Sequence, residues 1–175
     1  MTEYQPDWSF DMMAWIFRIR DLFTPRRKVL EEVPLREGIK VLDYGTGPGG
    51  YIEHTLNVIG EKGTYYAADI NPRAEKYVDA VRKKTGHPGL QFILTDCKTG
   101  LGSSSVDAVY LHDIYHELPD REGILIELKR VLKKDGILSF NDHHLKGEDI
   151  RNDGPLTKHF RILEEGKRTS IMKKR

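Results

Sequence analysis

The chain has 175 residues, which is about the length of one globular domain. Apolar residues make up 38% of it and aromatic residues 9%, enough for a sizeable core, which excludes a disordered chain and a small disulfide-stapled scaffold. The 28 Lys and Arg residues nearly balance the 27 Asp and Glu residues, and this disfavours a dedicated nucleic-acid-binding protein.

Cysteine content and hydropathy indicate the compartment. Cys97 is the one cysteine of the sequence, so an internal disulfide, a zinc knuckle and a CxxC pair are excluded, which fits a reducing compartment. No stretch approaches the roughly 18 consecutive apolar residues of a membrane helix. Glu3, Asp7 and Asp11 are unlike the basic start of a signal peptide. We therefore expect a cytoplasmic protein without a membrane span.

The first predicted element is a helix with apolar side chains on two faces. One stripe consists of Trp8, Met12, Trp15, Ile16, Ile19, Leu22 and Phe23, and the other of Phe10, Met13 and Phe17. One face can pack on the domain, and the other fits a homodimer surface, further buried packing or a lid over the substrate. Thr24 and Pro25 then predict the N-cap and first position of a short helix that ends near Val33. We treat residues 1–35 as an N-terminal helical cap.

From residue 36 onward, short apolar runs alternate with amphipathic stretches, a pattern typical of a sheet covered by helices. The predicted strands are Ile39–Tyr44, Thr64–Asp69, Leu90–Leu94, Val106–Leu111 and Ile137–Phe140. The predicted helices span about 50–59, 71–84 and 120–133, and Asp135-Gly136 predicts a turn before the fifth strand. Strands joined through helices must run parallel with right-handed crossovers.

The end of the chain departs from this alternation. Lys158–Glu164 and Lys167–Met172 predict two strands joined by a tight turn at Glu165-Gly166. We therefore expect an α/β fold for residues 36–175, a doubly wound, mostly parallel seven-stranded sheet with helices on both faces and a C-terminal antiparallel β-hairpin. The segment 142–157 contains no motif and predicts no element.

A glycine cluster, Gly45-Thr46-Gly47-Pro48-Gly49-Gly50, follows the first strand. Such glycines let the chain turn sharply and let a ligand approach the backbone, beside the N–H groups of the next helix. The cluster also fits the dinucleotide fingerprint, which is a weak signal alone. Asp43 precedes it, and a carboxylate there would repel a pyrophosphate but suit an ammonium, a sulfonium or hydroxyl groups. Asp43 also fits a purely structural role as a cap for the amides of the loop.

Two further acids stand at the ends of the next two strands. Asp69 ends the second strand, where a carboxylate can accept both hydroxyls of a ribose or cap the helix that starts at Asn71. Asp96 follows the third strand and can accept from an adenine amino group, while the backbone N–H of Cys97 serves a ring nitrogen; ordinary loop solvation also fits. Because parallel strands share one carboxyl edge, we expect Asp43, Asp69 and Asp96 to surround a nucleoside pocket without phosphates.

These motifs resemble those of the class I S-adenosylmethionine-dependent methyltransferases over about residues 36 to 175. Val41-Leu-Asp-Tyr-Gly-Thr-Gly-Pro-Gly49 is similar to the glycine motif of that family, and Asp69 and Asp96 fall where its ribose-binding and adenine-contacting acids lie. The segment Val106–Leu118 is similar to its fourth-strand motif, and the closing hairpin corresponds to its last two strands. No Asn/Asp-Pro-Pro-Tyr motif follows the fourth strand, which disfavours the branch that methylates nucleic-acid amines.

The resemblance implies transfer of a methyl group from S-adenosylmethionine to an acceptor, with S-adenosylhomocysteine as the product. The donor-binding residues that it implies are Asp43, Gly45, Thr46, Gly47, Gly49, Asp69, Ile70, Asp96, Cys97 and His112. The acceptor is not identified by the sequence: a small molecule is favoured, a protein stays open, and nucleic acid is disfavoured.

Histidines gather after the fourth and fifth strands, as His112 and His116 in one group and His143 and His144 in the other. Both groups should open on the same rim of the sheet. We assign no metal site, because His112 ends a strand and need not face His116. His116 is the candidate general base, which is required only for a hydroxyl, carbon-acid or protonated-amine acceptor.

Two alternative functions stay open at this point. A nicotinamide-dependent oxidoreductase would share the strand, loop and helix, but Asp43, the closing hairpin and the lack of a Tyr-x-x-x-Lys pair disfavour it. A catalytically silent S-adenosylmethionine-binding or interaction protein would keep the same donor pocket, so these motifs do not separate it from an enzyme.

Overall fold

The structure is a computed structural model that describes residues 6–23, 26–145 and 147–175, with 13 and 17–23 as backbone only. Within these residues the strands are β1 (Lys40–Tyr44), β2 (Thr64–Asp69), β3 (Leu90–Leu94), β4 (Val106–His112), β5 (Leu132–Asn141), β6 (Phe160–Glu165) and β7 (Ser170–Lys174). The helices are α1 (Asp7–Phe23), α2 (Arg27–Leu30), α3 (Ile52–Ile59), α4 (Arg73–Thr85), α5 (Arg121–Val131), α6 (Glu148–Asn152) and α7 (Gly154–His159), with a 3-10 turn η1 at Tyr115–Glu117.

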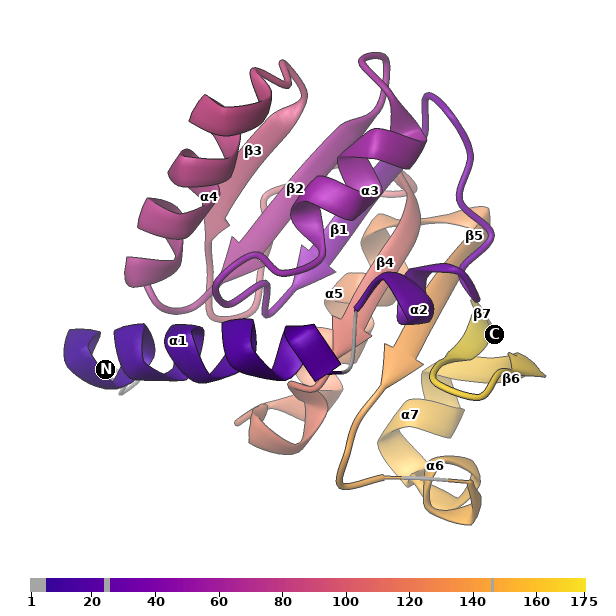
Figure 1. Cartoon of the computed structure of the whole chain (residues 1–175). Coiled ribbons are helices and arrows are strands. Elements are labelled where there is room, and N and C mark those ends of the chain that lie inside the picture. The colour runs from indigo at the N-terminus through magenta and orange to yellow at the C-terminus, as the bar shows by residue number, and fades with distance from the viewer. Residues whose placement is uncertain (1–5, 24–25, 146) are drawn as a thin grey trace.

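One sheet contains all seven of these strands in the order β3-β2-β1-β4-β5-β7-β6. The pairs from β3 to β5 are parallel, and β7 pairs antiparallel with both β5 and β6. Figure 1 shows α3 and α4 on one face of the sheet and α5 on the other. The predicted α/β fold, with its mostly parallel sheet and closing hairpin, is confirmed.

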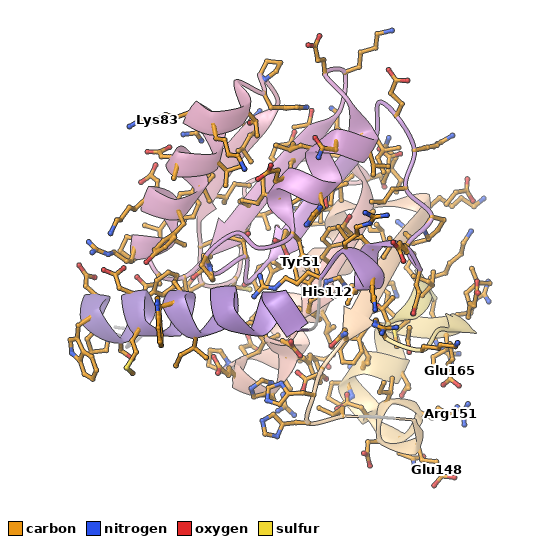
Figure 2. The ribbon with its side chains drawn as sticks, viewed as in Figure 1. Tyr51, Lys83, His112, Glu148, Arg151 and Glu165 are labelled. Carbon is orange, nitrogen blue, oxygen red and sulfur yellow. The ribbon has the colours of Figure 1, made fainter. Side chains whose placement is uncertain are left out.

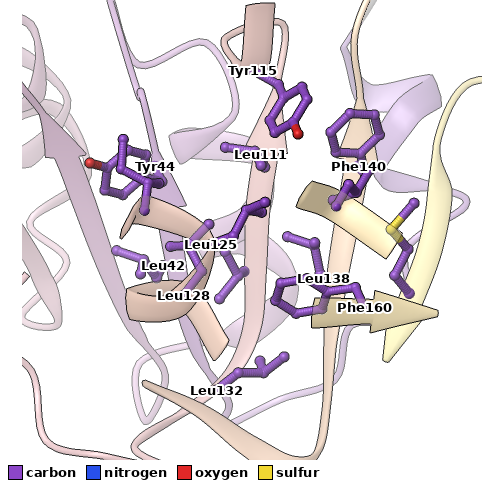
Figure 3. Close-up of a cluster of buried hydrophobic side chains, with 14 of the residues drawn as sticks. Leu42, Tyr44, Leu111, Tyr115, Leu125, Leu128, Leu132, Leu138, Phe140 and Phe160 are labelled. Atoms are coloured by element: carbon purple, nitrogen blue, oxygen red, sulfur yellow. The ribbon is translucent and has the colours of Figure 1, made fainter. Parts of the chain in front are cut away.

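Each face of the sheet has its own hydrophobic cluster. Under α5 and α7, buried side chains from the helices meet those of the central strands (Figure 3), among them Leu42, Leu111, Leu125, Leu128, Leu138 and Phe160. Under α2, α3 and α4, the second cluster includes Leu30, Ile52, Leu56, Tyr65, Val78 and Tyr110. Because both faces are covered, the central strands are apolar throughout rather than alternating.

The predicted turn before the fifth strand is wrong. Leu132 already pairs with Val106, and the ladder resumes at Ala108 with Ile137 after a local irregularity, so Asp135 and Gly136 lie inside β5. A bulge of this kind accommodates extra residues in one strand. Gly136 is needed there because a Cβ would come 2.9 Å from the carbonyl oxygen of Asp107.

The unassigned segment 142–157 contains α6 and the start of α7. The side chain of Asp153 accepts a hydrogen bond from the backbone N–H of Leu156 at 2.8 Å and so caps α7, with Pro155 in the first turn. This is a standard start signal for a helix, and it was present in the sequence. The second helix is shorter than predicted, since α2 covers Arg27–Leu30. Its predicted cap, Thr24 and Pro25, lies outside the described residues.

Helix α1 lies across the end of the sheet to which the arrows of β1 and β2 point (Figure 1). The carboxylate of Asp11 accepts from Arg73 at 2.6 Å and from the Tyr77 hydroxyl at 2.7 Å, both on α4. Phe10 is buried, and its ring lies 5.8 Å from that of Tyr77. The opposite face leaves four large side chains exposed, those of Trp8, Met12, Trp15 and Ile16. The two-faced helix is thus confirmed for the side chains that are described.

Among the described residues, no helix combines the length and the apolar character that crossing a membrane requires.

The core under α5 gives a stability prediction. Leu128 is fully buried, so Leu128→Ala should lower the free energy of unfolding by about 2–5 kcal/mol through lost burial and a residual cavity. Ile126 on the same helix is 51% exposed, and Ile126→Ala should change it by less than about 0.5 kcal/mol. Urea unfolding of both variants measures the difference. Equal effects of the two substitutions would contradict this description of the core.

Candidate functional site

The candidate site lies where the strand order reverses, between β1 and β4. In open α/β sheets, ligands bind outside the carboxyl ends of the strands at such a switch point. Five segments meet at this edge: the glycine loop after β1, the ends of β2 and β3, the turn after β4 and the loop after β5.

The glycine loop folds back over the end of β2. The N–H groups of Gly45 and Thr46 both donate to the carbonyl oxygen of Ala68, at 2.8 and 3.0 Å. Gly45 has a φ of +80°, and a Cβ there would come 2.6 Å from the Ile114 side chain, so no other residue fits without displacement. The loop is therefore in contact with β2 on one side and with the turn after β4 on the other.

Asp69 holds this loop in place. Its carboxylate accepts from the backbone N–H of Gly47 and from that of Asn71, each at 2.8 Å. Burial raises the pKa of Asp69, although these two bonds act in the opposite direction. The alternative role of Asp69 as cap of α4 is taken by Asn71, whose side-chain oxygen accepts from the N–H of Arg73 at 2.9 Å. Ile70, which lies between Asp69 and Asn71 in the sequence, is partly buried.

Asp43 lies behind the loop rather than at its surface. Its Oδ2 accepts from the hydroxyls of Tyr65 at 2.6 Å and Thr46 at 2.7 Å, and the residue is 2% exposed. Burial raises the pKa of Asp43 to about 6, against the lowering effect of these bonds and of the Arg26 guanidinium. The hydrogen bonds observed at Asp43 come from side-chain hydroxyls. They do not include the loop amides that the alternative structural role required.

Asp96 and Cys97 follow β3 at the same edge. Asp96 is exposed, and Cys97 is partly buried. The backbone N–H of Cys97 donates to the Thr95 hydroxyl oxygen at 3.1 Å, so the donor predicted for an adenine ring nitrogen already has a partner. Burial raises the pKa of the Tyr44 hydroxyl, and the negative charges of Cys97, Asp96 and Asp69 add to this effect. Asp69 and Asp96 therefore both lie near the hydroxyl of Tyr44.

The structure thus brings the three predicted acids to one edge. The charge of Asp69 contributes to the raised pKa of Asp43, and Asp69 and Asp96 both act on Tyr44. Their strands are neighbours in the sheet, with Asp43 paired to Ala67 and Asp69 to Leu94.

His112 is buried among aromatic rings. Tyr110 stacks on it with ring centroids 5.0 Å apart, and Tyr51 meets it edge-on at 4.8 Å, as Figure 2 shows for the labelled pair. Burial and, to a smaller extent, the nearby Arg26 guanidinium lower the pKa of His112 to about 3. The imidazole is therefore neutral at pH 7 and too weak a base to take a proton from an acceptor.

The hydrogen-bond chain behind His112 fixes its tautomer. Thr169 donates its hydroxyl proton to the carbonyl oxygen of Phe140 at 2.9 Å, so it accepts from Ser139 at 2.8 Å. Ser139 in turn accepts from Nε2 of His112 at 2.8 Å. The lone pair is then on Nδ1, which is buried and has no hydrogen-bond partner within the described chain. This nitrogen can accept one hydrogen bond from a ligand.

The two histidine groups do open on one rim, through Asp142. Its Oδ2 accepts from the backbone N–H of His116 at 3.1 Å and pairs with the ring Nδ1 at 2.9 Å, and its Oδ1 accepts from the N–H of His144 at 2.8 Å. The ring of His143 lies beside both others. The sequence analysis assigned no metal site because it considered His112 and His116 as the pair of ligands. The structure instead brings His116 together with His143 and His144.

Sequence reasoning missed the groups that support the site from behind. Tyr65 is the donor to Asp43, and its position in the middle of β2 gave no signal. The Arg26 guanidinium lies 5.1 Å from the centre of the Tyr51 ring, and a Cβ on Gly50 would overlap it. Asp142 was visible as an acid directly after a strand, the same signal that identified Asp43, Asp69 and Asp96.

Asp43 gives a pH prediction. A carboxyl group whose pKa is raised from 3.8 to about 6 by folding destabilises the folded state progressively between those pH values. Asp43→Asn keeps an accepting oxygen and removes the charge. The unfolding free energy of the variant relative to the wild type should therefore rise by up to about 3 kcal/mol from pH 4 to pH 7. Urea unfolding across this range measures it, and a difference independent of pH would refute the assignment.

Comparisons with known proteins bear on this site. Residues 42–140 match the family model described as a methyltransferase domain. Among curated proteins, the sterol 24-C-methyltransferase erg6 of Aspergillus fumigatus is 31% identical over 150 residues, covering 82% of this chain and 38% of the relative. A trans-aconitate 2-methyltransferase of Rhizobium rhizogenes is 27% identical over 143 residues, covering 78% and 54%. The chain therefore spans between two fifths and little more than half of these relatives.

A solved structure matches over the whole chain. The SAM-dependent methyltransferase from Aquifex aeolicus has a TM-score of 0.73 and 27% identity, and the match covers 97% of this chain and 99% of that one. The segment matched by the family model begins beside Asp43, ends at Phe140 and includes the glycine loop and both later acids. On these grounds the chain belongs to the class I S-adenosylmethionine-dependent methyltransferases.

Proposed function

We propose that this domain transfers the methyl group of S-adenosylmethionine to a small-molecule acceptor and releases S-adenosylhomocysteine. The observation that carries the proposal is the Asp69 carboxylate bonded to the Gly47 and Asn71 amides at the switch point of the sheet. S-adenosylmethionine carries an ammonium, a sulfonium and ribose hydroxyls, and an edge lined with carboxylates suits all three. A nicotinamide dinucleotide would bring a pyrophosphate against the same charges, which argues against the oxidoreductase alternative.

Asp69 has the remaining capacity that a ribose requires. A carboxylate has about four lone-pair positions, and the backbone N–H groups of Gly47, Asn71 and Ile70 all act on Asp69. The remaining capacity can accept a ribose hydroxyl without opening the loop. We propose that Gly45, Gly47 and Gly49 present backbone to the methionyl part and that Ile70 lies against the ribose.

The proposed roles of the other residues toward S-adenosylmethionine follow from their places around the carboxyl edge of the sheet. Asp96 is proposed to accept from the adenine amino group, with Cys97 beside the ring. Thr46 is proposed to position the loop, since its hydroxyl bonds to the buried Asp43, which adds negative potential behind it. His112 offers the lone pair of Nδ1 to a donor N–H or O–H at the mouth of the pocket.

When bound, S-adenosylmethionine supplies an electrophilic methyl group on a positively charged sulfur. The protein then mainly has to align the acceptor and exclude water, and proximity and orientation can contribute several kcal/mol. For an acceptor that must lose a proton, His116 is the proposed base. Its Nδ1 pairs with Asp142, which orients the ring and leaves Nε2 to take the proton.

A small-molecule acceptor is supported by the relatives and by charge. The names of the matched relatives refer to a sterol, to trans-aconitate and, for a mouse relative, to arsenite. A single cysteine disfavours arsenic chemistry that depends on several thiolates, and a net charge of +1 disfavours bulk nucleic acid.

The remaining proposals concern the N-terminal helix, the oligomeric state and the cellular compartment. We propose that residues 1–35 form a cap over the site, because α1 lies across the carboxyl edge of the sheet (Figure 1). The exposed Trp8 and Trp15 on its outer face are consistent with a homodimer through this helix. The single Cys97 is consistent with a reducing compartment, the cytoplasm.

The ribose role of Asp69 is tested by binding. Asp69→Ala removes both acceptors and should weaken S-adenosylhomocysteine binding by at least about tenfold, since hydrogen bonds to a charged group contribute about 1.5–3 kcal/mol. Asp135 is an exposed acid near the start of β5, away from the carboxyl end of that strand, and Asp135→Ala should bind like the wild type. Calorimetric titration measures both, and thermal unfolding without ligand verifies folding. Unchanged affinity in a folded Asp69→Ala protein would refute the donor assignment.

The adenine role of Asp96 is tested with a changed ligand. Asp96→Ala should weaken S-adenosylhomocysteine binding about two- to tenfold, because the exposed carboxylate loses one hydrogen bond. The analogue with inosine in place of adenosine has no amino group, so the same substitution should not weaken its binding. If Asp96→Ala weakens the binding of both ligands equally, Asp96 does not accept a hydrogen bond from the adenine amino group.

Release of S-adenosylhomocysteine separates the enzyme from the silent binding protein. A coupled assay follows its formation from S-adenosylmethionine in the presence of a panel of small hydroxy acids, amines and sterols. Turnover that is lost in Asp69→Ala supports methyl transfer, whereas tight donor binding without turnover on any acceptor class favours the silent alternative.

A further inference from the structure

Three histidines from two loops gather at the rim beside the donor pocket. His116 lies in η1 after β4, and His143 and His144 lie in the loop after β5. One ring nitrogen from each lies within 4.8 Å of those of the other two. The ring centroids are 4.1 to 4.7 Å apart. Three imidazoles this close have little reason to assemble unless they share a ligand or a proton.

Carboxylates hold two of the rings so that the same nitrogen is free on each. Nδ1 of His116 pairs with Asp142 at 2.9 Å, and Nδ1 of His143 lies 3.3 Å from a carboxylate oxygen of Asp113. Nε2 of each ring therefore carries the lone pair, provided that the carboxylates are ionised. Imidazoles that bind metal ions usually have their other nitrogen on a carboxylate in this way, which fixes the tautomer and the ring orientation.

To bind an ion, the three ring nitrogens have to move closer together than they now lie. Zn²⁺ binds imidazole nitrogens at about 2.0–2.1 Å, so tetrahedral ligands lie about 3.4 Å apart. The present separations of up to 4.8 Å exceed this modestly. His143 and His144 are exposed and can turn inward, whereas His116 is half-buried and anchored to Asp142.

The charges around the cluster favour a cation. Asp142 and Asp113 stand behind the rings, and a carboxylate oxygen of Glu117 lies 3.6 Å from Nε2 of His116. The guanidinium of Arg121 also contacts this turn, where it donates to the backbone carbonyl oxygens of Tyr115 and His116. Three neutral imidazoles with three acids beside them would form a net negative site.

We propose that His116, His143 and His144 bind one divalent transition-metal ion, of the class represented by Zn²⁺, at the acceptor side of the donor pocket. Imidazole ligands suit Zn²⁺, Ni²⁺ or Cu²⁺ and not Mg²⁺ or Ca²⁺, which prefer oxygen. Three protein ligands leave a position open, as in catalytic zinc sites rather than structural ones.

The cluster lies close to the donor pocket. The negative charge of Glu117 contributes to raising the pKa of Asp69. The turn that carries His116 therefore lies near the carboxylate that is proposed to bind the ribose. Ile114, two residues before His116, is the side chain that a Cβ on Gly45 would strike. The turn that carries His116 and the glycine loop are therefore in contact at the same edge of the sheet.

The ion would change the role of His116. A nitrogen that binds the metal cannot also take a proton, so a bound hydroxyl acceptor would instead lose its proton to solvent because the ion lowers its pKa. The oxygen then attacks the methyl carbon, and the carbon–sulfur bond breaks with its electron pair left on sulfur. This role rests on the proposed methyl transfer, whereas the metal site itself does not.

Zinc titration of the tag-free, chelator-treated chain tests the site. We expect one equivalent of Zn²⁺ to bind with a Kd below about 1 μM. His116→Ala, His143→Ala and His144→Ala should each weaken it by at least tenfold. His54 is an exposed histidine on α3, so His54→Ala should bind like the wild type. Binding weaker than about 100 μM, or equal binding by the cluster variants and the wild type, overturns the proposal.

Three further measurements keep the test independent of folding and of the donor site. Asp142→Asn should lower zinc affinity by about 10- to 100-fold, as loss of a carboxylate behind a ligating histidine does elsewhere. Zinc should raise the thermal midpoint of the wild type and of His54→Ala but not of the cluster variants, and Mg²⁺ should raise none of them. S-adenosylhomocysteine binding measured with chelator present shows separately whether the donor pocket works, so failure of zinc binding alone removes only the metal proposal.

Discussion

The carboxylate of Asp69 accepts the backbone N–H of Gly47 on one oxygen and that of Asn71 on the other. These bonds tie the loop after β1 to the segment after β2, so two parts of the chain that are distant in sequence form one wall of the site. The loop can follow this path only because Gly45 has a left-handed φ and no side chain to meet Ile114. The position of the glycine loop beside β2 and its contact with the turn after β4 both depend on this arrangement.

Burial sets the chemistry of the groups around that wall. Tyr65 and Thr46 hold Asp43 behind the loop, where burial raises the pKa of its carboxyl group at a cost to stability. Burial also keeps the imidazole of His112 neutral at pH 7. It can therefore form hydrogen bonds but is too weak a base to take a proton. His116 differs because it is half-buried and paired with Asp142, and proton transfer and metal binding are therefore both within its chemistry.

The sequence predicted most of the fold and the positions of the acids, and its failures have physical causes. Strands and the glycine loop were visible because apolar runs and glycines at fixed places leave few alternatives. Asp135-Gly136 was read as a turn, although pairing of Leu132 with Val106 extends β5 through it. Partners distant in the sequence, such as Tyr65 for Asp43, left no local signal. The sequence placed both histidine groups on one rim, but spacing along the chain does not show that His116, rather than His112, meets His143 and His144.

A crystal structure with S-adenosylhomocysteine bound tests the central claim most directly. The account predicts the ribose hydroxyls within about 2.6–3.0 Å of the two Asp69 oxygens, with the Gly47 and Asn71 bonds retained and the sulfur facing the rim that carries His116. A nucleoside bound away from Asp69, or a glycine loop that has left Asp69 on binding, would contradict it.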